Sequence, residues 1–218
     1  MTDQKKIRLR SLLGRIFRRT WRTNHADWFC CQLPGKALAL SEGEAASEAC
    51  LIWDDYETSI AWIREQSHRF KWIYNAREVE IGENYRHFYP LLLYGGKPVG
   101  YIKIALETAF VEDYEDCLPL TPDEAFICDT FILPESRGKG LARVMLEQAL
   151  TRLGDQGLRF VFCHIPGWNT ASIRLYQGLG FRRIGHVRYL RLLGLRLFSN
   201  DPLKTKARGR SLAIASGG

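Results

Sequence analysis

A short turn at residues 137–142 holds the residues best suited to chemistry in this chain of 218 residues. A strand-like run leads into the turn, and an amphipathic pattern typical of a helix follows it. The first turn of a helix presents unpaired N–H groups and the positive end of the helix dipole. Gly138 and Gly140 allow the backbone to approach a ligand closely, while Arg137 and Lys139 add positive charge. These features predict a site for a phosphate or diphosphate, as in a nucleotide or coenzyme A.

Other phosphate-binding patterns do not fit this turn. The P-loop pattern G-x-x-x-x-G-K-[ST] does not occur in the sequence. The dinucleotide pattern G-x-G-x-x-G begins at Gly138 and Gly140, but Arg143 stands where its third glycine belongs. A plain strand–turn–helix junction, with glycine used only for backbone geometry, is the alternative interpretation.

Two motifs resemble the GCN5-related N-acetyltransferase (GNAT) superfamily. Residues 137–142 resemble its R/Q-x-x-G-x-G/A motif, and the residues before them, 132–135, are similar to its V-x-P-E. Residues 169–181 are similar to N-x-x-A-x-x-L-Y-x-x-x-G-F, with Ser172 in place of alanine as the one departure. The resemblance covers residues 86–198 well and the first 85 residues only loosely.

The resemblance implies an acetyl-CoA site and gives each matching residue a role. Backbone amides of 137–142 would hold the diphosphate, and the strand before them would pair with the pantetheine arm where it separates from the next strand. Asn169 would lie near the cofactor, and Tyr176 would protonate the departing thiolate. The residues expected to bind acetyl-CoA are Phe131, Ile132, Leu133, Arg137, Gly138, Lys139, Gly140, Leu141, Ala142 and Asn169.

Acetyl transfer to an amine also needs a base, because an ammonium must lose a proton before it can attack. Asp129 and Glu124, both on the strand 125–133 or at its start, are the candidates. Solvated or ion-paired carboxylates, or a chain of waters acting as the base, are the alternatives. For Tyr176 the alternative is a core tyrosine on an amphipathic helix, although an ordinary phenol pKa of about 10 suits an acid.

The distribution of charge favours a cationic acceptor. The net charge of +7 divides into +7 over residues 1–22, +8 over 181–218 and −8 between them, which argues against a nucleic-acid partner. No basic residue lies between Lys103 and Arg137, whereas nine acids do. We therefore expect a primary amine of a peptide, protein, polyamine or amino sugar to be attracted there. The carboxylates expected to steer it are Glu112, Asp113, Glu115 and Asp116.

Residues 5–22 form a basic amphipathic pattern with helical spacing. Contact with an anionic membrane or an acidic protein is one hypothesis for this helix, and packing on the acidic body is the alternative. The expected organisation is a basic extension over 1–24, an acyltransferase domain over 25–198 and a flexible basic tail over 199–218. Neither a spanning segment nor a secretory signal is expected, the six cysteines suit reduced thiols, and no zinc spacing occurs, so we expect a cytoplasmic protein without a metal.

The order of elements predicts an α/β (α+β) fold, with a mixed sheet flanked by helices. The resemblance to the GNAT superfamily implies that this central sheet is mostly antiparallel. Expected strands are 28–33, 88–94, 99–104, 125–133, 159–165 and 181–198, and expected helices are 56–70, 141–153 and 170–179. The leading functional hypothesis is an N-acetyltransferase that uses acetyl-CoA in a ternary complex. A silent module that senses or docks acyl-CoA, and an acyltransferase using longer acyl-CoA or acyl carrier protein, are the alternatives.

Overall fold

A computed structural model describes most of the chain. The described residues are 21–33, 44–73, 79, 84, 86–111, 116–192, 195–200, 204–207 and 210–211. Residues 5–20 of the helix expected over 5–22 lie outside them. The steering residues Glu112, Asp113 and Glu115 and the side chain of Asp116 also lie outside them.

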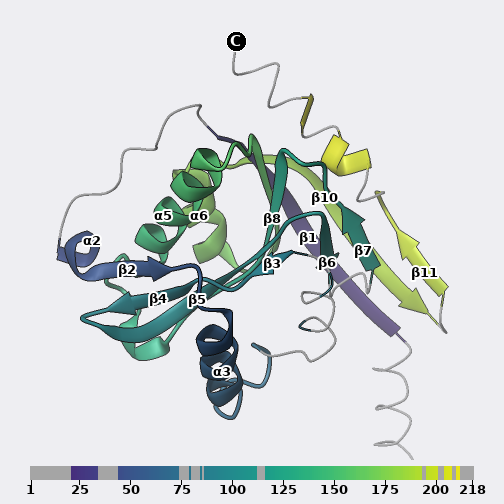
Figure 1. Ribbon diagram of the computed structural model, residues 1–218. Coiled ribbons are helices and arrows are strands. Elements are labelled where there is room, and N and C mark those ends of the chain that lie inside the picture. The colour runs from purple at the N-terminus through teal and green to yellow at the C-terminus, as the bar shows by residue number, and fades with distance from the viewer. Residues whose placement is uncertain are drawn as a thin grey trace, which may run out of the picture.

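Nine strands of the described part form one sheet (Figure 1), and a separate hairpin lies beside it. The strand order is β11-β10-β1-β9-β8-β5-β4-β2, with β3 paired to β5. Only β8 and β9 run parallel, so the sheet is mixed and mostly antiparallel, which confirms the expected fold class. The strands are β1 (Trp21–Gln32), β2 (Ala49–Ile52), β3 (His87–Phe88), β4 (Leu91–Tyr94), β5 (Lys97–Ala105), β8 (Glu124–Ile132), β9 (Phe160–Pro166), β10 (Arg182–Leu192) and β11 (Leu195–Phe198), and the hairpin comprises β6 (Thr108–Val111) and β7 (Asp116–Pro119).

Helices cover both faces of the sheet. The helices α5 (Leu141–Asp155) and α6 (Thr170–Gly178) lie on one face, and α3 (Tyr56–Gln66) lies on the other, with the short α2 (Glu44–Glu48) beyond the sheet edge. Apolar side chains at helical spacing on α5, including Met145 and Leu146, are fully buried. Ile60 and Ile63 bury the corresponding stripe of α3. The apolar stripes of α5 and α3 therefore pack into two separate cores, one on each face of the sheet.

Local signals explain most of the element boundaries. The turn between β4 and β5 has Gly95 and Gly96 at φ of 55° and 74°, the left-handed conformation that tight hairpins require. The Asp55 carboxylate caps α3 by accepting from the N–H of Thr58 at 3.1 Å. The short strands β2, β6 and β7 were not among the expected elements, because four-residue strands give little periodicity.

The first strand is longer than its apolar run indicates. It starts at Trp21, where the sequence predicts the end of a helix, and pairs antiparallel with β10 along its length. The boundary expected at residue 25 therefore lies inside β1. Long-range pairing with β10 decides the conformation here, and helical spacing of apolar residues does not reveal it.

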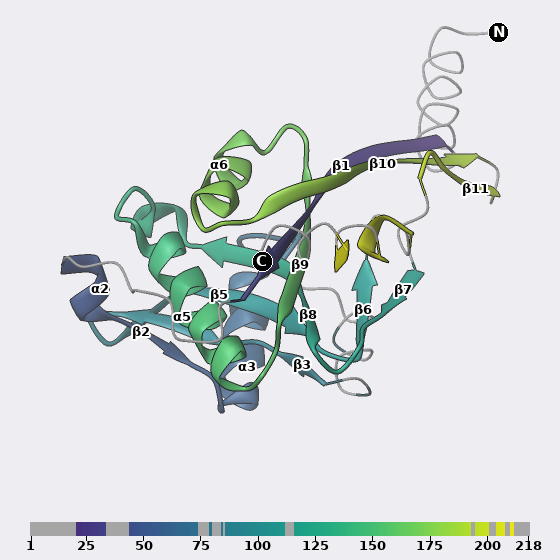
Figure 2. The same ribbon diagram turned by 90° about the horizontal axis from the view of Figure 1, so that it is seen from above.

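The described part of the C-terminal segment contains buried residues, where a flexible tail is expected over residues 199–218. Thr205 and Lys206 are only 7% and 8% exposed. Lys206 Nζ donates to the carbonyl of Pro119 at 2.7 Å, so the segment lies beside β7, as Figure 2 also shows. A Cβ on Gly185 of β10 would come within 2.7 Å of the Thr205 side chain. The described residues 204–207 and 210–211 thus pack on the sheet, which corrects the expectation for them.

Candidate active site

The parallel strands β8 and β9 separate halfway along their length. Their pairing runs from Glu124 opposite Phe160 to Ile127 opposite Cys163, and the described register ends there. Beyond that point β8 continues to pair with β5, up to Ile132 opposite Gly100. The edge of β8 that faces β9 therefore opens over residues 128–132. No β9 residue pairs with this edge in the described register, so an extended ligand could add to the strand there.

A bulge in β8 lies at the start of this opening. Lys103 is opposite Asp129 and Ile104 is opposite Ile127, so Cys128 is an extra residue in the strand. Without the extra residue, Asp129 would lie on the same face as Ile127, toward α5 and α6. The bulge places Asp129 on the α3 face instead, with Tyr101 and Phe131. Bulges of this kind occur next to active sites because they redirect a side chain.

The turn after β8 has the geometry of an anion cradle. The short 3-10 helix η2 (Pro134–Ser136) ends at the turn, and Gly138 and Gly140 follow at φ of 81° and 78°. A Cβ on either glycine would meet no heavy atom within 4 Å, so the space beside the backbone is open. Gly140 is the N-cap of α5 and has no side chain to satisfy the first N–H groups of that 15-residue helix. The residues present thus fit a diphosphate group, as the motif predicts.

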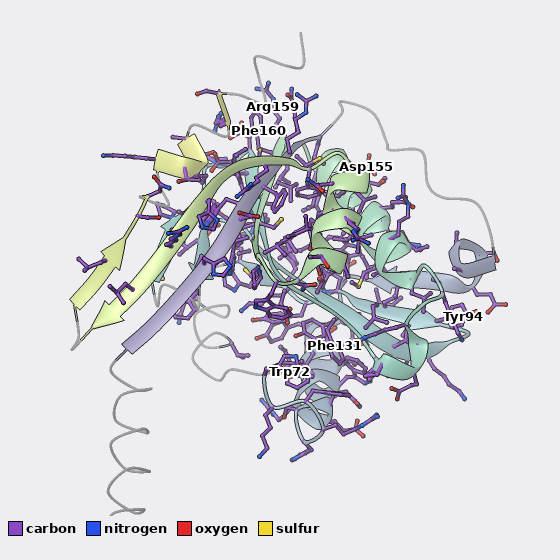
Figure 3. All side chains as sticks on the ribbon, turned by 180° about the vertical axis from the view of Figure 1, so that it is seen from behind. Trp72, Tyr94, Phe131, Asp155, Arg159 and Phe160 are labelled. Carbon is purple, nitrogen blue, oxygen red and sulfur yellow. The ribbon has the colours of Figure 1, made fainter. Side chains whose placement is uncertain are left out.

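Both basic side chains of the turn lie on aromatic rings. Arg137 Nε donates to the carbonyl of Ile132 at 3.0 Å, and its guanidinium lies 6.0 Å from the centre of the Phe131 ring. Lys139 Nζ lies 5.0 Å from the centre of the Tyr94 ring. Phe131 and Tyr94 are both labelled in Figure 3, with Tyr94 at the right-hand end of the sheet. These contacts hold positive charge on both sides of the cradle.

Tyr176 lies at the point where the strands part. Its ring packs edge-on against Phe181 at 4.9 Å, and only 3% of the residue is exposed. Its hydroxyl lies near the side chain of Thr130, and its electrostatic neighbours include Cys163 and Asp129. Burial, followed by these acidic neighbours, raises the pKa of Tyr176 well above 10. The phenol is therefore protonated at neutral pH, as an acid must be.

Asp129 lies on the opposite face of β8 from Thr130. One carboxylate oxygen accepts a short hydrogen bond from the Tyr101 hydroxyl, and the other accepts from the N–H of Thr130 at 2.8 Å. The carboxylate and the Tyr176 hydroxyl thus approach the bulge from the two faces of the sheet. This arrangement can supply a base and an acid to atoms placed in the gap.

Glu124, the other carboxylate considered as a base, lies at the far end of β8. It is 2% exposed, and Lys206 Nζ donates to it at 2.6 Å and Arg210 at 3.2 Å. Burial alone would raise the pKa of Glu124, but hydrogen bonds from Lys206 and from the N–H of Thr121 lower it overall. The structure therefore brings Asp129 and Tyr176 together and leaves Glu124 in an ion pair.

Asn169 has a structural task of its own. It is the N-cap of α6, and its side chain accepts from the N–H of Ser172 at 3.2 Å. The departure from the motif at position 172 does not disturb this cap, because the donor is a backbone group.

Sequence reasoning did not single out Tyr101 and Lys103, which lie on β5 opposite Phe131 and Asp129. The signal for them was a lysine inside the run 99–105, which otherwise holds only glycine, apolar and aromatic residues.

An aromatic wall borders the α3 face of the site. Phe70 lies 5.1 Å from Phe131 and 5.5 Å from Trp72, measured between ring centres, and Phe131 lies 5.9 Å from Tyr101. Trp72 is 70% exposed, so the wall reaches solvent beyond α3 (Figure 3). Within the described part of the chain, no group of three or more His, Cys, Asp or Glu side chains is arranged to hold a metal.

Comparison with known proteins assigns the chain that carries this site to a family. The model of the acetyltransferase (GNAT) family matches residues 48–181, more than half of the chain. The chain belongs to the GNAT family. The matched range contains the cradle, the bulge and Tyr176, so the family's region and the candidate site coincide.

Curated relatives of this GNAT chain include proteins named as acetyltransferases. The mycothiol acetyltransferase of Thermobispora bispora is 44% identical over 50 residues, which are 23% of this chain and 17% of the relative. The chain thus matches under a fifth of that relative's length. The ribosomal protein bS18 alanine N-acetyltransferase of Escherichia coli is 25% identical over 119 residues, 55% of this chain and 70% of the relative.

Solved structures support the fold. A GNAT-family protein from Novosphingobium aromaticivorans superposes with a TM-score of 0.50 at 16% sequence identity, covering 78% of this chain and 65% of the other. In the described part of the GNAT chain, no helix is long and apolar enough to cross a membrane.

Proposed function

We propose that this protein is an N-acetyltransferase that moves an acetyl group from acetyl-CoA to a primary amine. The observation that carries the proposal is the parting of β8 and β9 at the bulge, with Asp129 on one face of β8 and the Tyr176 hydroxyl on the other. A base and an acid on opposite faces suit a reaction in which one group loses a proton and another gains one.

The donor in this proposal is acetyl-CoA, which supplies the thioester. The cradle at Gly138–Gly140 would bind its diphosphate through the N–H groups at the start of α5. The open edge of β8 would hold the pantetheine arm, and Asn169 would lie alongside. This chain's own residues then do the proton chemistry: Asp129 accepts a proton from the amine, directly or through water, and Tyr176 donates its phenolic proton to sulfur.

The acceptor enters, in this proposal, on the α3 face. Asp129 lies there beside the aromatic wall, and a carboxylate with aromatic rings nearby attracts a cationic amine. The name of one relative, the ribosomal protein bS18 alanine N-acetyltransferase, gives a protein alanine as the acceptor, so peptide amines belong in the acceptor set beside small amines. The proposed compartment is the cytoplasm, and membrane or acidic-protein contact through residues 5–22 remains part of the hypothesis.

The experiment that tests the proposal is an acceptor screen. Purified protein, acetyl-CoA and a panel of polyamines, amino sugars and peptides would be incubated, with thiol release and acetylated product followed by mass spectrometry. We expect amine-dependent release of coenzyme A, and acetyl-CoA binding that weakens at least tenfold in Arg137→Glu. Binding of acetyl-CoA with no turnover of any amine would favour the silent sensor instead.

A further inference from the structure

Lys103 is a charged side chain buried inside the sheet. It is 3% exposed, and its neighbours along β5, Ile102 and Ile104, are completely buried. A lysine is almost never buried to this extent unless its ammonium is paired, because removing the charge from water is costly. The position therefore requires a compensating group, and the register of the sheet indicates which group it is.

Asp129 lies directly opposite Lys103 in the antiparallel pair of β5 and β8. Residues that face each other in such a pair have Cβ atoms about 5 Å apart on one face of the sheet. Tyr101, two residues away on β5, reaches the same carboxylate with its hydroxyl, which shows that both strands direct these side chains to the α3 face. The Lys103 ammonium also lies 5.9 Å from the centre of the Tyr89 ring, in cation–π range.

The other titratable groups near this pair come from several elements. Tyr101 on β5 donates to Asp129, Tyr176 on α6 interacts with it electrostatically from the other face, and Cys128 precedes it in β8. On β3, burial and then the Lys103 charge lower the pKa of His87 to about 4, although a hydrogen bond with the Thr108 carbonyl opposes them, so His87 is neutral at pH 7. On β9, the His164 ring packs 5.8 Å from Phe126 on the same face. In these surroundings the Lys103 ammonium supplies positive charge directly across from Asp129.

We propose that Lys103 is a positioning residue, whose buried ammonium keeps the Asp129 carboxylate ionised and directed toward the acceptor amine. The proposal rests on the proposed function, in which Asp129 takes the proton. A partly buried carboxylate on this aromatic face would otherwise favour its neutral form, which can neither attract an ammonium nor accept its proton. An opposite charge across the strand pair reverses that preference.

The test compares Lys103→Met with Lys103→Arg as its charge-preserving control. With an acceptor from the screen, kcat/KM is measured from pH 5 to 9 in the wild type and both variants. For Lys103→Met we expect the acidic limb of the profile to move to higher pH by about 1 unit or more, and for Lys103→Arg we expect it to return toward the wild-type position. An equal loss at every pH, with the limb unmoved, would overturn the proposal in favour of a packing role.

A second measurement does not depend on activity. The carboxyl carbons of the aspartates are labelled with ¹³C. The Asp129 resonance is the one that is missing from the spectrum of Asp129→Asn. Its chemical shift is then followed against pH in the wild type and in Lys103→Met. We expect the Asp129 carboxyl to titrate at higher pH in Lys103→Met, and identical titration in the two proteins would overturn the proposal. If the wild type had no transferase activity, the proposed function would be refuted, but the NMR titration would still test the interaction between Lys103 and Asp129.

If Lys103→Met does not fold, the interaction between Lys103 and Asp129 can still be tested by substituting Asp129. The Lys103 ammonium protons are observed by ¹⁵N NMR in the wild type and in Asp129→Asn. We expect them to exchange with water at least tenfold faster in Asp129→Asn, because the carboxylate that holds them is gone. Unchanged exchange would show that Asp129 is not the partner and would overturn the proposal.

Discussion

The two ends of β8 carry one carboxylate each, and the surroundings of the two carboxylates differ. At the first end, Glu124 is closed in by Lys206 and Arg210 of the C-terminal segment, next to a strand partner, Phe160, that completes the ladder. At the second end, Asp129 lies where β9 has left the strand, beside a bulge and a gap. Figure 3 shows the separation, with Phe160 and Phe131 at opposite ends of the strand pair.

The comparison teaches that partners and backbone geometry, more than residue type, decide what a carboxylate can do. Both acids lie on one strand and both belong to the same acidic stretch of sequence. Glu124 stabilises the fold because its charge is buried and paired within the chain. Asp129 lies beyond the residues of β8 that pair with β9, on the face that carries the aromatic wall. We therefore expect substitutions at the first end to change stability and those at the second end to change catalysis.

The largest expected effect is on catalysis at the open end. Asp129→Asn should lower kcat/KM about 10³-fold, because an amide cannot accept the proton of the amine. Steady-state kinetics with the best acceptor measures this loss. Glu124→Gln is the matched control, with kcat/KM expected within a few-fold of wild type. Similar losses in both variants would remove the distinction between the two ends.

The next effect is on stability at the closed end. Lys206→Met should lower the free energy of unfolding by about 3 kcal/mol, since it leaves a buried carboxylate with one cation fewer. Thermal unfolding followed by circular dichroism should show a fall in Tm of about 6–12 °C for a chain of this size. Lys204→Met, at an exposed position in the same segment, should leave Tm nearly unchanged. An unchanged Tm in Lys206→Met would mean that the C-terminal segment does not hold the sheet.

Tyr176→Phe should lower kcat about 10²-fold through loss of the acid that protonates sulfur. The wild-type rate should not fall through ionisation of this phenol below pH 10, because burial raises the pKa of Tyr176 well above that value. A kcat–pH profile to pH 10 in both proteins measures the two expectations. Full activity of Tyr176→Phe would make the tyrosine a core residue, the alternative that its burial also allows.

The smallest expected effect is the acid dependence of stability from Glu124. Its folded pKa lies below the ordinary value of 4.5, so its stabilising contribution is complete above about pH 4.5 and is lost as the pH falls through the lowered pKa. In Glu124→Gln the unfolding free energy should lose about 1 kcal/mol less between pH 5 and pH 3 than in the wild type. Urea unfolding at both pH values measures this difference. If the unfolding free energy fell by the same amount between pH 5 and pH 3 in both proteins, the ion pair between Glu124 and Lys206 would not form.

The amino-acid sequence by itself determined the parts of the site that depend on neighbouring residues. A strand, two glycines and a helix start are local features, so the cradle at 137–142 could be predicted from its motif, as could the hairpin turn at Gly95-Gly96 and the helix that carries Tyr176. Each depends on backbone conformations that a few adjacent residues select.

Only the tertiary structure decided how the acids are used. Glu124 and Asp129 look equivalent in the sequence, because the partner of the first, Lys206, is 82 residues away and the bulge that turns the second depends on pairing with β5. Lys103 became relevant for the same reason, since only the register of two strands places it opposite Asp129. Contacts between distant residues set burial and charge pairing, and these determine which carboxylate stabilises the fold and which is left for a ligand.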